Sequence, residues 1–362
     1  QIPIFRGGSC VKKVKLGDLG KIITGNTPSK KTLEFYDSND IPFIKPDDFK
    51  TIDEISSSKG NKNYVSENAR NSARIVPKNS VLVTCIGIIG KVMISESELS
   101  FNQQINAIVP NELILSKYLA YLLLYNKPKL DFISNAPVVP IINKTQFSEF
   151  EVTFHKDIDI QEKIIQNLEN LDNQILKRRH QSRLLLNLVK SRFNEMFGDP
   201  INNDKKFAEK TGQQCFKFSS GKFLDKNDRI FEGYPAYGGN GIAWKSRNYL
   251  IDNPTIIIGR VGAYCGNVRT THGKVWISDN AIYIKEFKNL DFNLVFLLEL
   301  MKVIDFSRFA DFSGQPKITQ KPLEKQKYIL PSLSLQNEFA DFVAQVDKSQ
   351  FACQKAIKLW RN

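Results

Sequence analysis

The feature that most constrains the fold is an internal repeat. Two long helical patterns, Asp159–Phe197 and Leu335–Arg361, each follow a Val/Ile/Phe-rich segment of similar size that is interrupted by turns. When Gln161 is superimposed on Gln336, apolar positions coincide along both helical patterns. A chain with such a repeat has to be interpreted as two copies of one plan. We therefore predict two globular modules, each closed by a helix.

The features before each helix occur in the same order in both copies. They are a β-branched run typical of a buried strand, a glycine turn, a further strand and a short helix. This order predicts a mixed α/β fold for each module. The matching segments are Ser80–Ile86, Gly87–Gly90, Phe101–Val109 and Ser116–Tyr125 in the first module, and Thr255–Val261, Gly262–Gly266, Val275–Ile284 and Phe292–Met301 in the second.

Two further comparisons concern the loops. The segment Val138–Ile142, which we expect to be a late strand, corresponds to Gly314–Ile318. By contrast, Phe223–Arg247 has no clear counterpart between Thr24 and Asn61. Loops on a rigid scaffold usually carry specificity, so the two copies are expected to differ in what they bind.

The two long helices have apolar residues at the alternating four- and three-residue spacing of a coiled-coil seam. Polar residues interrupt the seam, and the first helix alone would span roughly 55 Å, more than a small module needs. We therefore expect the helices to pair antiparallel as a spacer; the alternative is that each packs only on its own module. The second is expected either to continue past Asn362 or to fray. The predicted packing residues are Ile164, Leu168, Leu171, Ile175, Leu185, Val189, Phe339, Val343, Val346, Cys353, Ile357 and Trp360.

The charge balance indicates a polyanionic partner. The chain has 51 Lys and Arg against 38 Asp and Glu, a net charge of +13, and nucleic acid is the simplest partner for such an excess. On charge alone, a basic protein without such a partner is an equal alternative. The five cysteines have no metal-ligand or redox spacing, which favours reduced thiols in a cytoplasmic protein. We expect no membrane association, because no apolar run approaches the length of a membrane span.

The sequence is poor in catalytic motifs. The three histidines, His155, His180 and His272, lack the spacing of a metal site or a catalytic triad. There is no P-loop, and the glycine turns lack the pattern of a dinucleotide loop. We therefore predict no catalytic residues, no metal site and no cofactor in this chain. The acidic pair Asp47-Asp48 is expected to form an ordinary turn or to accept hydrogen bonds from cytosine.

The sequence is richer in residues suited to binding nucleic acid. Asn and Gln can bind adenine bidentately, Arg and Lys can bind guanine or phosphate, and aromatic rings can stack. Any one of these residues is more often a solvated surface group, but as a set they favour a DNA surface. Arg229 is among the cations that could contact phosphate, and for Trp244 and Tyr264 stacking on a ligand and packing in the core are about equally expected. The predicted DNA-binding residues are Thr24, Asn26, Thr27, Ser29, Lys30, Lys45, Asp47, Lys59, Lys62, Lys91, Gln103, Gln104 and Lys144 in the first copy, and Tyr237, Asn240, Lys245, Arg247, Arg260, Tyr264, Lys274, Asp279, Asn280, Gln315 and Lys317 in the second.

Several of these segments together resemble the specificity subunit of a type I restriction–modification system. No single motif is decisive, but their order and the duplicated plan are specific, and they cover nearly the whole chain. The segments that carry the resemblance are Lys15–Gly20, Thr24–Ser29, Ile44–Asp48, Ile158–Ile164, Met196–Pro200, Ser278–Ala281, Gly314–Ile318 and Leu333–Gln336.

The resemblance implies a non-catalytic subunit that recognises a bipartite double-stranded DNA site. It implies target-recognition domains at 1–158 and 199–333 and spacer helices at 159–198 and 334–362. Two modification subunits would methylate adenine with S-adenosylmethionine, and restriction subunits using ATP and Mg²⁺ join in some such systems. The alternatives are a subunit of a related methylation-only or phage-exclusion system, a stand-alone DNA-binding regulator, and an enzyme with its own nuclease or methyltransferase centre.

Overall fold

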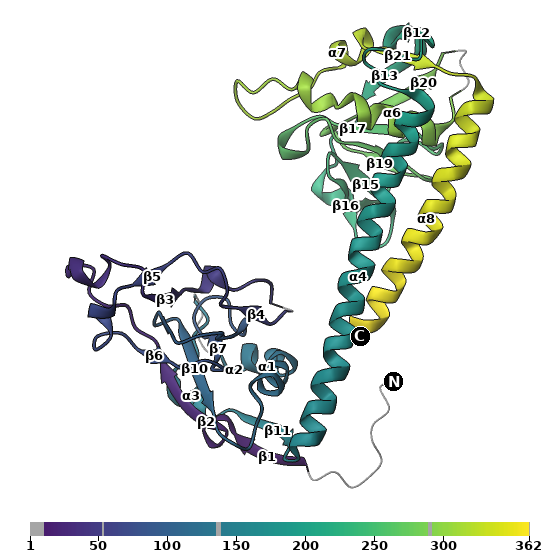
Figure 1. Cartoon of the computed structure of the whole chain (residues 1–362). Coiled ribbons are helices and arrows are strands. Elements are labelled where there is room, and N and C mark those ends of the chain that lie inside the picture. The colour runs from purple at the N-terminus through teal and green to yellow at the C-terminus, as the bar shows by residue number, and fades with distance from the viewer. Residues whose placement is uncertain (1–10, 53, 135–138, 289–291, 362) are drawn as a thin grey trace. The chain divides into compact units, whose positions relative to one another are not determined.

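The computed structural model describes residues 11–52, 54–134, 139–288 and 292–361, with side chains described up to Leu359. The chain divides into two compact units, Gln1–Asn173 (unit 1) and Gln174–Asn362 (unit 2). Both units are mixed α/β, as predicted, and helix α4 (Ile158–Phe197) begins in the first and ends in the second (Figure 1). The four-part division predicted from sequence stays a prediction.

Unit 1 is built on short strands. The strands are β1 (Val11–Lys15), β2 (Gly20–Thr24), β3 (Ile41–Ile44), β4 (Ser56–Ser57), β5 (Tyr64–Val65), β6 (Ile75–Val76), β7 (Val81–Thr84), β8 (Val92–Ile94), β9 (Leu99–Phe101), β10 (Ile105–Pro110) and β11 (Glu151–His155). They form a central sheet in the order β2-β10-β7-β8-β4, a smaller sheet in the order β5-β3-β9-β6, and the pair β1-β11.

The central sheet of unit 1 is buried on both faces because its side chains alternate between two cores. Val81 and Val83 of β7 pack against α1, whereas Leu82 belongs to a second core with Phe101 and Ile44 of the smaller sheet. This explains why the β7 sequence is apolar without alternation. The helices of unit 1 before α4 are α1 (Ser116–Tyr125), α2 (Lys127–Ile133) and α3 (Lys144–Glu149), with 3-10 turns η1 (Leu16–Asp18), η2 (Leu33–Phe35), η3 (Pro46–Asp48) and η4 (Glu67–Ala69).

Unit 2 has the same plan. Its strands are β12 (Ala208–Thr211), β13 (Phe216–Ser220), β14 (Arg229–Ile230), β15 (Tyr234–Gly238), β16 (Gly241–Ser246), β17 (Ile256–Gly259), β18 (Val268–Thr270), β19 (Trp276–Ile277), β20 (Ala281–Phe287) and β21 (Lys327–Leu330). They form sheets in the orders β13-β20-β17-β18, β14-β16-β15-β19 and β12-β21. Its helices after α4 are α5 (Gly212–Cys215), α6 (Leu294–Ile304), α7 (Gln320–Lys325) and α8 (Leu333–Arg361), with 3-10 turns η5 (Lys226–Asp228), η6 (Gly262–Tyr264) and η7 (Phe306–Phe309).

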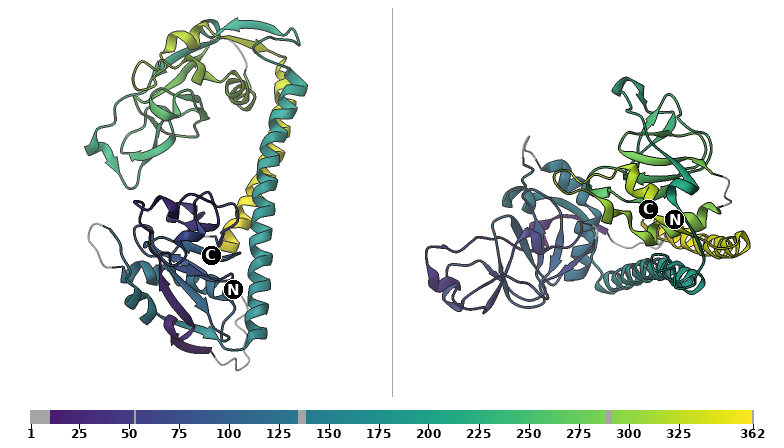
Figure 2. Two further views of the ribbon diagram at one scale, coloured as in Figure 1. Left: turned by 60° about the vertical axis from the view of Figure 1, so that its left-hand side comes forward. Right: turned by 90° about the horizontal axis from the view of Figure 1, so that it is seen from above.

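Within unit 2, the end of α4 and the long α8 pair antiparallel, as the seam predicts (Figure 2). Arg192 of α4 bridges Glu338 of α8 at 2.9 Å, and Gln350 of α8 donates to the carbonyl of Ser182 at 3.3 Å. Between these two contacts the residue number falls by ten along α4 and increases by twelve along α8, as in an antiparallel pair. The alternative that each helix packs only on its own module is excluded for this stretch.

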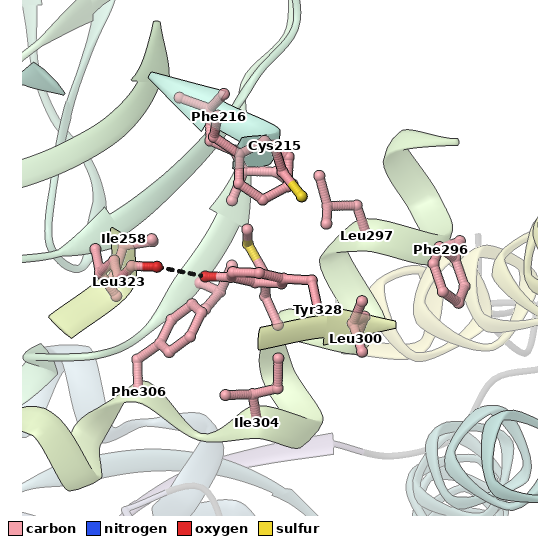
Figure 3. Close-up of a cluster of buried hydrophobic side chains, with 14 of the residues drawn as sticks. Cys215, Phe216, Ile258, Phe296, Leu297, Leu300, Ile304, Phe306, Leu323 and Tyr328 are labelled. Atoms are coloured by element: carbon pink, nitrogen blue, oxygen red, sulfur yellow. Dashed lines mark hydrogen bonds between the residues drawn. The ribbon is translucent and has the colours of Figure 1, made fainter. Parts of the chain in front are cut away.

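The helix pair continues into the core of unit 2. Phe193, Phe197 and Phe339 are at most 1% exposed, and the ring centroid of Phe339 lies 5.5 Å from those of both other rings. Behind them, Phe296 of α6 joins the same cluster, which extends to the buried side chains of Figure 3. There the hydroxyl of Tyr328 donates to the carbonyl of Leu323 at 3.3 Å, which satisfies a polar group that burial would otherwise penalise.

The repeat extends to individual backbone hydrogen bonds. In unit 1, Ile142 donates to the carbonyl of Cys85 at 2.9 Å. In unit 2, Ile318 donates to the carbonyl of Arg260 at 2.9 Å, in the corresponding place. The predicted strand Val138–Ile142 was wrong for its described residues 139–142, which contribute the single bridge Ile86↔Ile141. The segment is held in place without forming a strand, because its backbone hydrogen bonds join it to the turn that follows the buried strand.

The structure corrects two other predictions. The single strands expected at Phe101–Val109 and Val275–Ile284 are each interrupted by a tight turn, which sends the two halves into different sheets. The segment Phe223–Arg247 also has a counterpart after all. Strand β15 pairs parallel with β19 as β3 pairs parallel with β9, so Tyr237 occupies the place of Ile44. The amino-acid change at that place hides the correspondence from sequence comparison.

The superimposed glutamines have the same buried role in both units. The Gln161 amide accepts from the backbone N–H of Leu115 and donates to the carbonyls of Leu113 and His155, at 2.8–2.9 Å. Gln336 accepts from the N–H of Asn293 at 2.9 Å and donates to a carbonyl in the same way. Each glutamine therefore fixes the first turn of a long helix against the segment that leads into the short helix of its unit.

We expect Gln336→Leu to lower the free energy of unfolding of unit 2 by about 2–4 kcal/mol. The substitution leaves the half-buried N–H of Asn293 and the buried carbonyl of Pro331 without partners, and each buried group without a partner costs about 1–3 kcal/mol. Hydrogen exchange in peptides of α6 and α8 measures the effect. Gln345→Leu on the exposed face of the same helix is the control, and equal losses in the two variants would contradict the role of the buried amide.

The cysteines described in the structure are Cys85, Cys215, Cys265 and Cys353, and all four are buried free thiols. Cys85 belongs to the main core of unit 1 and Cys265 to that of unit 2. Burial raises the pKa of Cys85 to about 12 and that of Cys215 to about 11. These two groups are therefore protonated at neutral pH, and their sulfurs are poor nucleophiles. Cys10 lies outside the described residues.

Candidate nucleic-acid interface

Unit 2 has a cleft of about 460 Å³ that is lined by amide and aromatic side chains. Its walls come from the β15–β16 hairpin, the η6 turn, the turn between β19 and β20, and the segment around Gln315. These segments are far apart in the sequence. Six of the eleven residues predicted to bind DNA in the second copy line the cleft, namely Tyr237, Asn240, Tyr264, Asp279, Asn280 and Gln315.

A tight hairpin forms one wall. Gly238 pairs with Gly241, so Gly239 and Asn240 alone make the turn between β15 and β16. Gly241 has φ +103°, a backbone conformation that side chains rarely adopt, and glycine adopts it without strain. The turn presents the exposed amide of Asn240 at the cleft, where it has donors and an acceptor to offer a ligand.

The opposite wall is fixed by the backbone of the β19–β20 turn. The guanidinium of Arg260 donates to the carbonyl of Asp279 at 3.2 Å, and the N–H of Arg260 donates to the carbonyl of Asn280 at 2.9 Å. Arg260 is not part of the cleft lining; it supports the turn that carries Asp279 and Asn280. Tyr264 on η6 is 48% exposed, so the core position considered for it is wrong and its ring is available to a ligand.

A second aromatic side chain widens the cleft. Trp244 of β16 is 54% exposed and lines the cleft, which also excludes a core position for this residue. The guanidinium carbon of Arg229, on the neighbouring strand β14, lies 4.7 Å from the centroid of the Trp244 ring. The sequence indicates Arg229 only as one of several cations that could contact phosphate, and Trp244 as an aromatic residue that could stack on a ligand or pack in the core.

The other predicted residues of unit 2 lie outside the cleft lining. Lys245, Arg247, Lys274 and Lys317 are exposed, and the ammonium of Lys274 lies 4.8 Å from the ring centroid of Tyr249. Exposed cations of this kind suit contacts to phosphate groups rather than to base edges. The structure therefore separates the amide and aromatic residues, which converge, from the lysines, which do not line the cleft.

In unit 1, two of the predicted residues form a hydrogen-bonded pair, and two others lie at one turn. The hydroxyl of Thr27 donates to the amide oxygen of Gln103 at 2.9 Å, and both residues are exposed. Lys45 donates to the side chain of Asn63 at 2.7 Å. Asp47 is exposed beside it in η3, while Asp48 caps the turn, so the acidic pair forms a turn as one of the two expectations had it.

Three predicted residues of unit 1 are used by the fold itself. The hydroxyl of Thr24 donates to Asn106 at 2.6 Å, and the amide of Asn26 donates to the carbonyl of Ser72 at 2.7 Å. The side-chain oxygen of Gln104 accepts from Asn102 at 3.0 Å. These contacts favour structural roles. The remaining predicted side chains are exposed or half-buried. Lys144 is the first residue of α3, and the others lie on loops and turns and are Ser29, Lys30, Lys59, Lys62 and Lys91.

The predicted packing residues of the two helices are buried or half-buried wherever side chains are described. Ile164 packs against the core of unit 1 and not against the core that holds the helix pair, so the alternative of packing on its own module holds at this end of α4. Phe339, Val343, Val346, Cys353 and Val189 are at most 7% exposed. Phe193, which lies four residues after Val189 and is 1% exposed, was not among the predicted packing residues. The side chain of Trp360 lies outside the described residues.

The part of the chain that the structure describes contains neither a metal-binding cluster nor a helix that could span a membrane. No group of three or more His, Cys, Asp or Glu side chains in these residues is arranged to hold a metal ion. Across the same residues, every helix is too short or too polar to cross a membrane.

Comparison of the sequence with known proteins shows a match to one protein family. A family model described as "Type I restriction modification DNA specificity domain" matches the chain twice, over residues 9–184 and 204–359. The two matches fall on the two structural copies. Together they cover most of the chain.

Two curated relatives are type I restriction enzyme specificity subunits. The MjaIX subunit of Methanocaldococcus jannaschii is 31% identical over 200 residues, which cover 54% of this chain and 45% of that protein. The EcoprrI subunit of Escherichia coli is 22% identical over 357 residues, which cover 93% of this chain and 88% of that protein. The match thus spans less than half of the first relative and most of the second.

Two solved structures share the fold. The S subunit of a type I restriction–modification system from M. genitalium has a TM-score of 0.57 at 17% identity, with 99% of this chain and 94% of that chain covered. A chain from a structure on complex assembly and conformational transition of a type I R-M system has a TM-score of 0.53 at 12% identity, with 96% and 97% covered. At these identities the likeness concerns the fold.

Proposed function

Because the chain belongs to the family of type I restriction–modification specificity subunits, we propose that it binds a bipartite double-stranded DNA site and directs separate adenine-methylating subunits to that site. Each unit recognises one half of the site. The resemblance inferred from the sequence is confirmed at the level of the family.

The observation that best supports the proposal is the convergence of base-binding side chains in unit 2. Amides of Asn240, Asn280 and Gln315 line one cleft together with the rings of Tyr237 and Tyr264. Amide groups bind adenine through one donor and one acceptor, and aromatic groups contact the thymine methyl group. The net charge of +13 supplies long-range attraction to the phosphates. The same scaffold in unit 1 carries different loops, which suits a second half-site of different sequence.

We propose that catalysis resides in partner subunits. The chain has no P-loop or other cofactor motif in its sequence, so the methyl donor S-adenosylmethionine is assigned to two modification subunits. ATP and Mg²⁺ are assigned to restriction subunits, where the system has them. The proposed role of the helices is to set the distance between the half-sites and to dock the modification subunits. The proposed place of action is the cytoplasm.

The test is reconstitution on DNA. The purified chain with DNA, S-adenosylmethionine and Mg²⁺ is expected to transfer no methyl groups and to cut nothing. Addition of the modification subunits of the same system is expected to produce methylated adenine in each half of one bipartite site, measured by sequencing of the methylated DNA.

Other outcomes identify the alternatives. Methyl transfer or cleavage by the chain alone would refute the proposal in favour of an enzyme. Tight sequence-specific binding by the chain alone, unchanged by modification subunits that give no methylation, would instead favour a DNA-binding regulator.

A further inference from the structure

Unit 2 presents a stacked arginine at its cleft. Arg229 and Trp244 lie on adjacent antiparallel strands, and Arg229 is paired with Ser246, two residues along β16 from Trp244. This diagonal relation places both side chains on one face of the sheet. The guanidinium lies 4.7 Å from the centroid of the indole ring, and both residues line the cleft.

The guanidinium of Arg229 has hydrogen-bonding capacity to spare. Its terminal Nη2 donates to the carbonyl of Leu224 at 3.4 Å, a long contact, and its buried Nε has no acceptor in the structure. Among the described residues, no carboxylate forms an ion pair with it at the distances of the other ion pairs. The contact with Trp244 restricts the guanidinium. Its buried Nε is out of reach, but Nη1, which has no hydrogen bond to the described residues, and the weakly held Nη2 remain for an external acceptor.

This pair has no counterpart among the residues that the structure describes in unit 1. In the corresponding sheet of unit 1, strand β3 has β5 as its outer neighbour, and that strand has two residues. In unit 2, β15 has the six-residue β16 as its outer neighbour and β14 beyond it. The strand that carries Arg229 therefore has no counterpart among the described residues of unit 1. A feature that one copy adds to a shared scaffold is suited to specificity rather than to stability.

We propose, on the premise of the proposed function, that Arg229 recognises a guanine in the half-site bound by unit 2 and that Trp244 positions it. A planar guanidinium donates two parallel hydrogen bonds, which match the O6 and N7 acceptors of guanine in the major groove. A phosphate group offers a similar pair of acceptors. The surroundings favour the base, because the amides of Asn240, Asn280 and Gln315 line the same cleft, whereas the exposed lysines of unit 2 do not.

The experiment uses the complex of the full chain with its modification subunits. DNA libraries randomised across both half-sites are methylated by the wild type and by Arg229→Lys, Arg229→Ala and Trp244→Leu. Arg229→Lys keeps the charge and removes the planar pair of donors. Arg229→Lys and Arg229→Ala are expected to reduce the preference for guanine at one position of the unit 2 half-site by about 5- to 150-fold. Trp244→Leu is expected to relax the same position less.

The unit 1 half-site and the gap are the internal controls, and both are expected to stay unchanged in all three variants. Lys245→Ala is the matched comparison, because this exposed neighbour on β16 is expected to weaken methylation evenly across sequences.

Three results would overturn the inference: a wild-type unit 2 half-site without a G·C pair, an unchanged sequence preference in Arg229→Ala, or an even loss across sequences in the Arg229 variants, which would identify a phosphate contact. Absence of methylation by the wild-type complex would instead refute the proposed function. Because Arg229→Lys is conservative, it keeps the test valid if Arg229→Ala fails to fold.

Discussion

Phe339→Ala is expected to lower the free energy of unfolding of unit 2 by about 3–5 kcal/mol, the range for truncation of a fully buried phenylalanine. Phe339 is 0% exposed and makes edge contacts with Phe193 and Phe197 of α4 at 5.5 Å. Alanine at this place leaves a cavity where α4, α6 and α8 meet. Hydrogen exchange in peptides of β17 and β20 should increase, because these strands share the same core.

The same helix supplies a matched control. Phe351 lies on α8 with 68% of its surface exposed, and Phe351→Ala is expected to change stability by about 0.5 kcal/mol or less. Peptides of β2 and β10 in unit 1 serve as a reference within each variant. Equal exchange in the two variants would show that α8 contributes little to the core of unit 2, contrary to the packing described.

The long helices were the most predictable part of the fold. Their seam is a local pattern, so α4 and α8 follow from the spacing of apolar residues, and Gly198 at φ +67° ends α4 where the sequence predicts an end. Phe193 was missed because the packing residues predicted for the first helix end at Val189, one step before it. Because the seam repeats every three and a half residues, the next buried residue can lie three or four positions further along. Tertiary packing decides which of the two is buried.

The strands were less predictable because each long β-branched segment serves two sheets. The turn at Asn102–Gln104 separates β9 from β10, and neither residue type rules out a continuous strand. The correspondence of β15 with β3 was also hidden, since Tyr237 and Ile44 share a place in the backbone but little in side-chain chemistry. Backbone pairing retained the scaffold while the side chains diverged.

The residues of the cleft were also predictable only in part. Residue types suited to base contacts pointed to Asn240, Asn280 and Gln315, but their meeting depends on turns brought together by the sheets of unit 2. Arg229 was expected only as one of several phosphate contacts, because a single arginine in a polar segment has no feature in the sequence that marks it for a base. Its distinguishing feature is the indole of Trp244 across the strand pair, and sequence alone does not give that register.

Insertion of one heptad into α4 is expected to lengthen the gap between the two half-sites and to leave both half-site sequences unchanged. The insertion is a second copy of residues 167–173, placed after Asn173, at the division between the units. Seven residues advance a helix by about 10 Å and return to nearly the same face. The gap should therefore grow by at most about three base pairs, measured by sequencing DNA methylated by the reconstituted complex.

The insertion point keeps the contacts of both units intact. On one side, Tyr121 donates to Asp172 at 2.8 Å, so the packing of α4 on unit 1 is retained. On the other side, Ser182 and Arg192 keep their partners on α8. A single inserted residue is the control, because it turns the following helix by about 100° and is expected to abolish methylation at every gap tested. If the heptad variant changes a half-site sequence, or keeps the original gap, α4 does not set the distance between the half-sites.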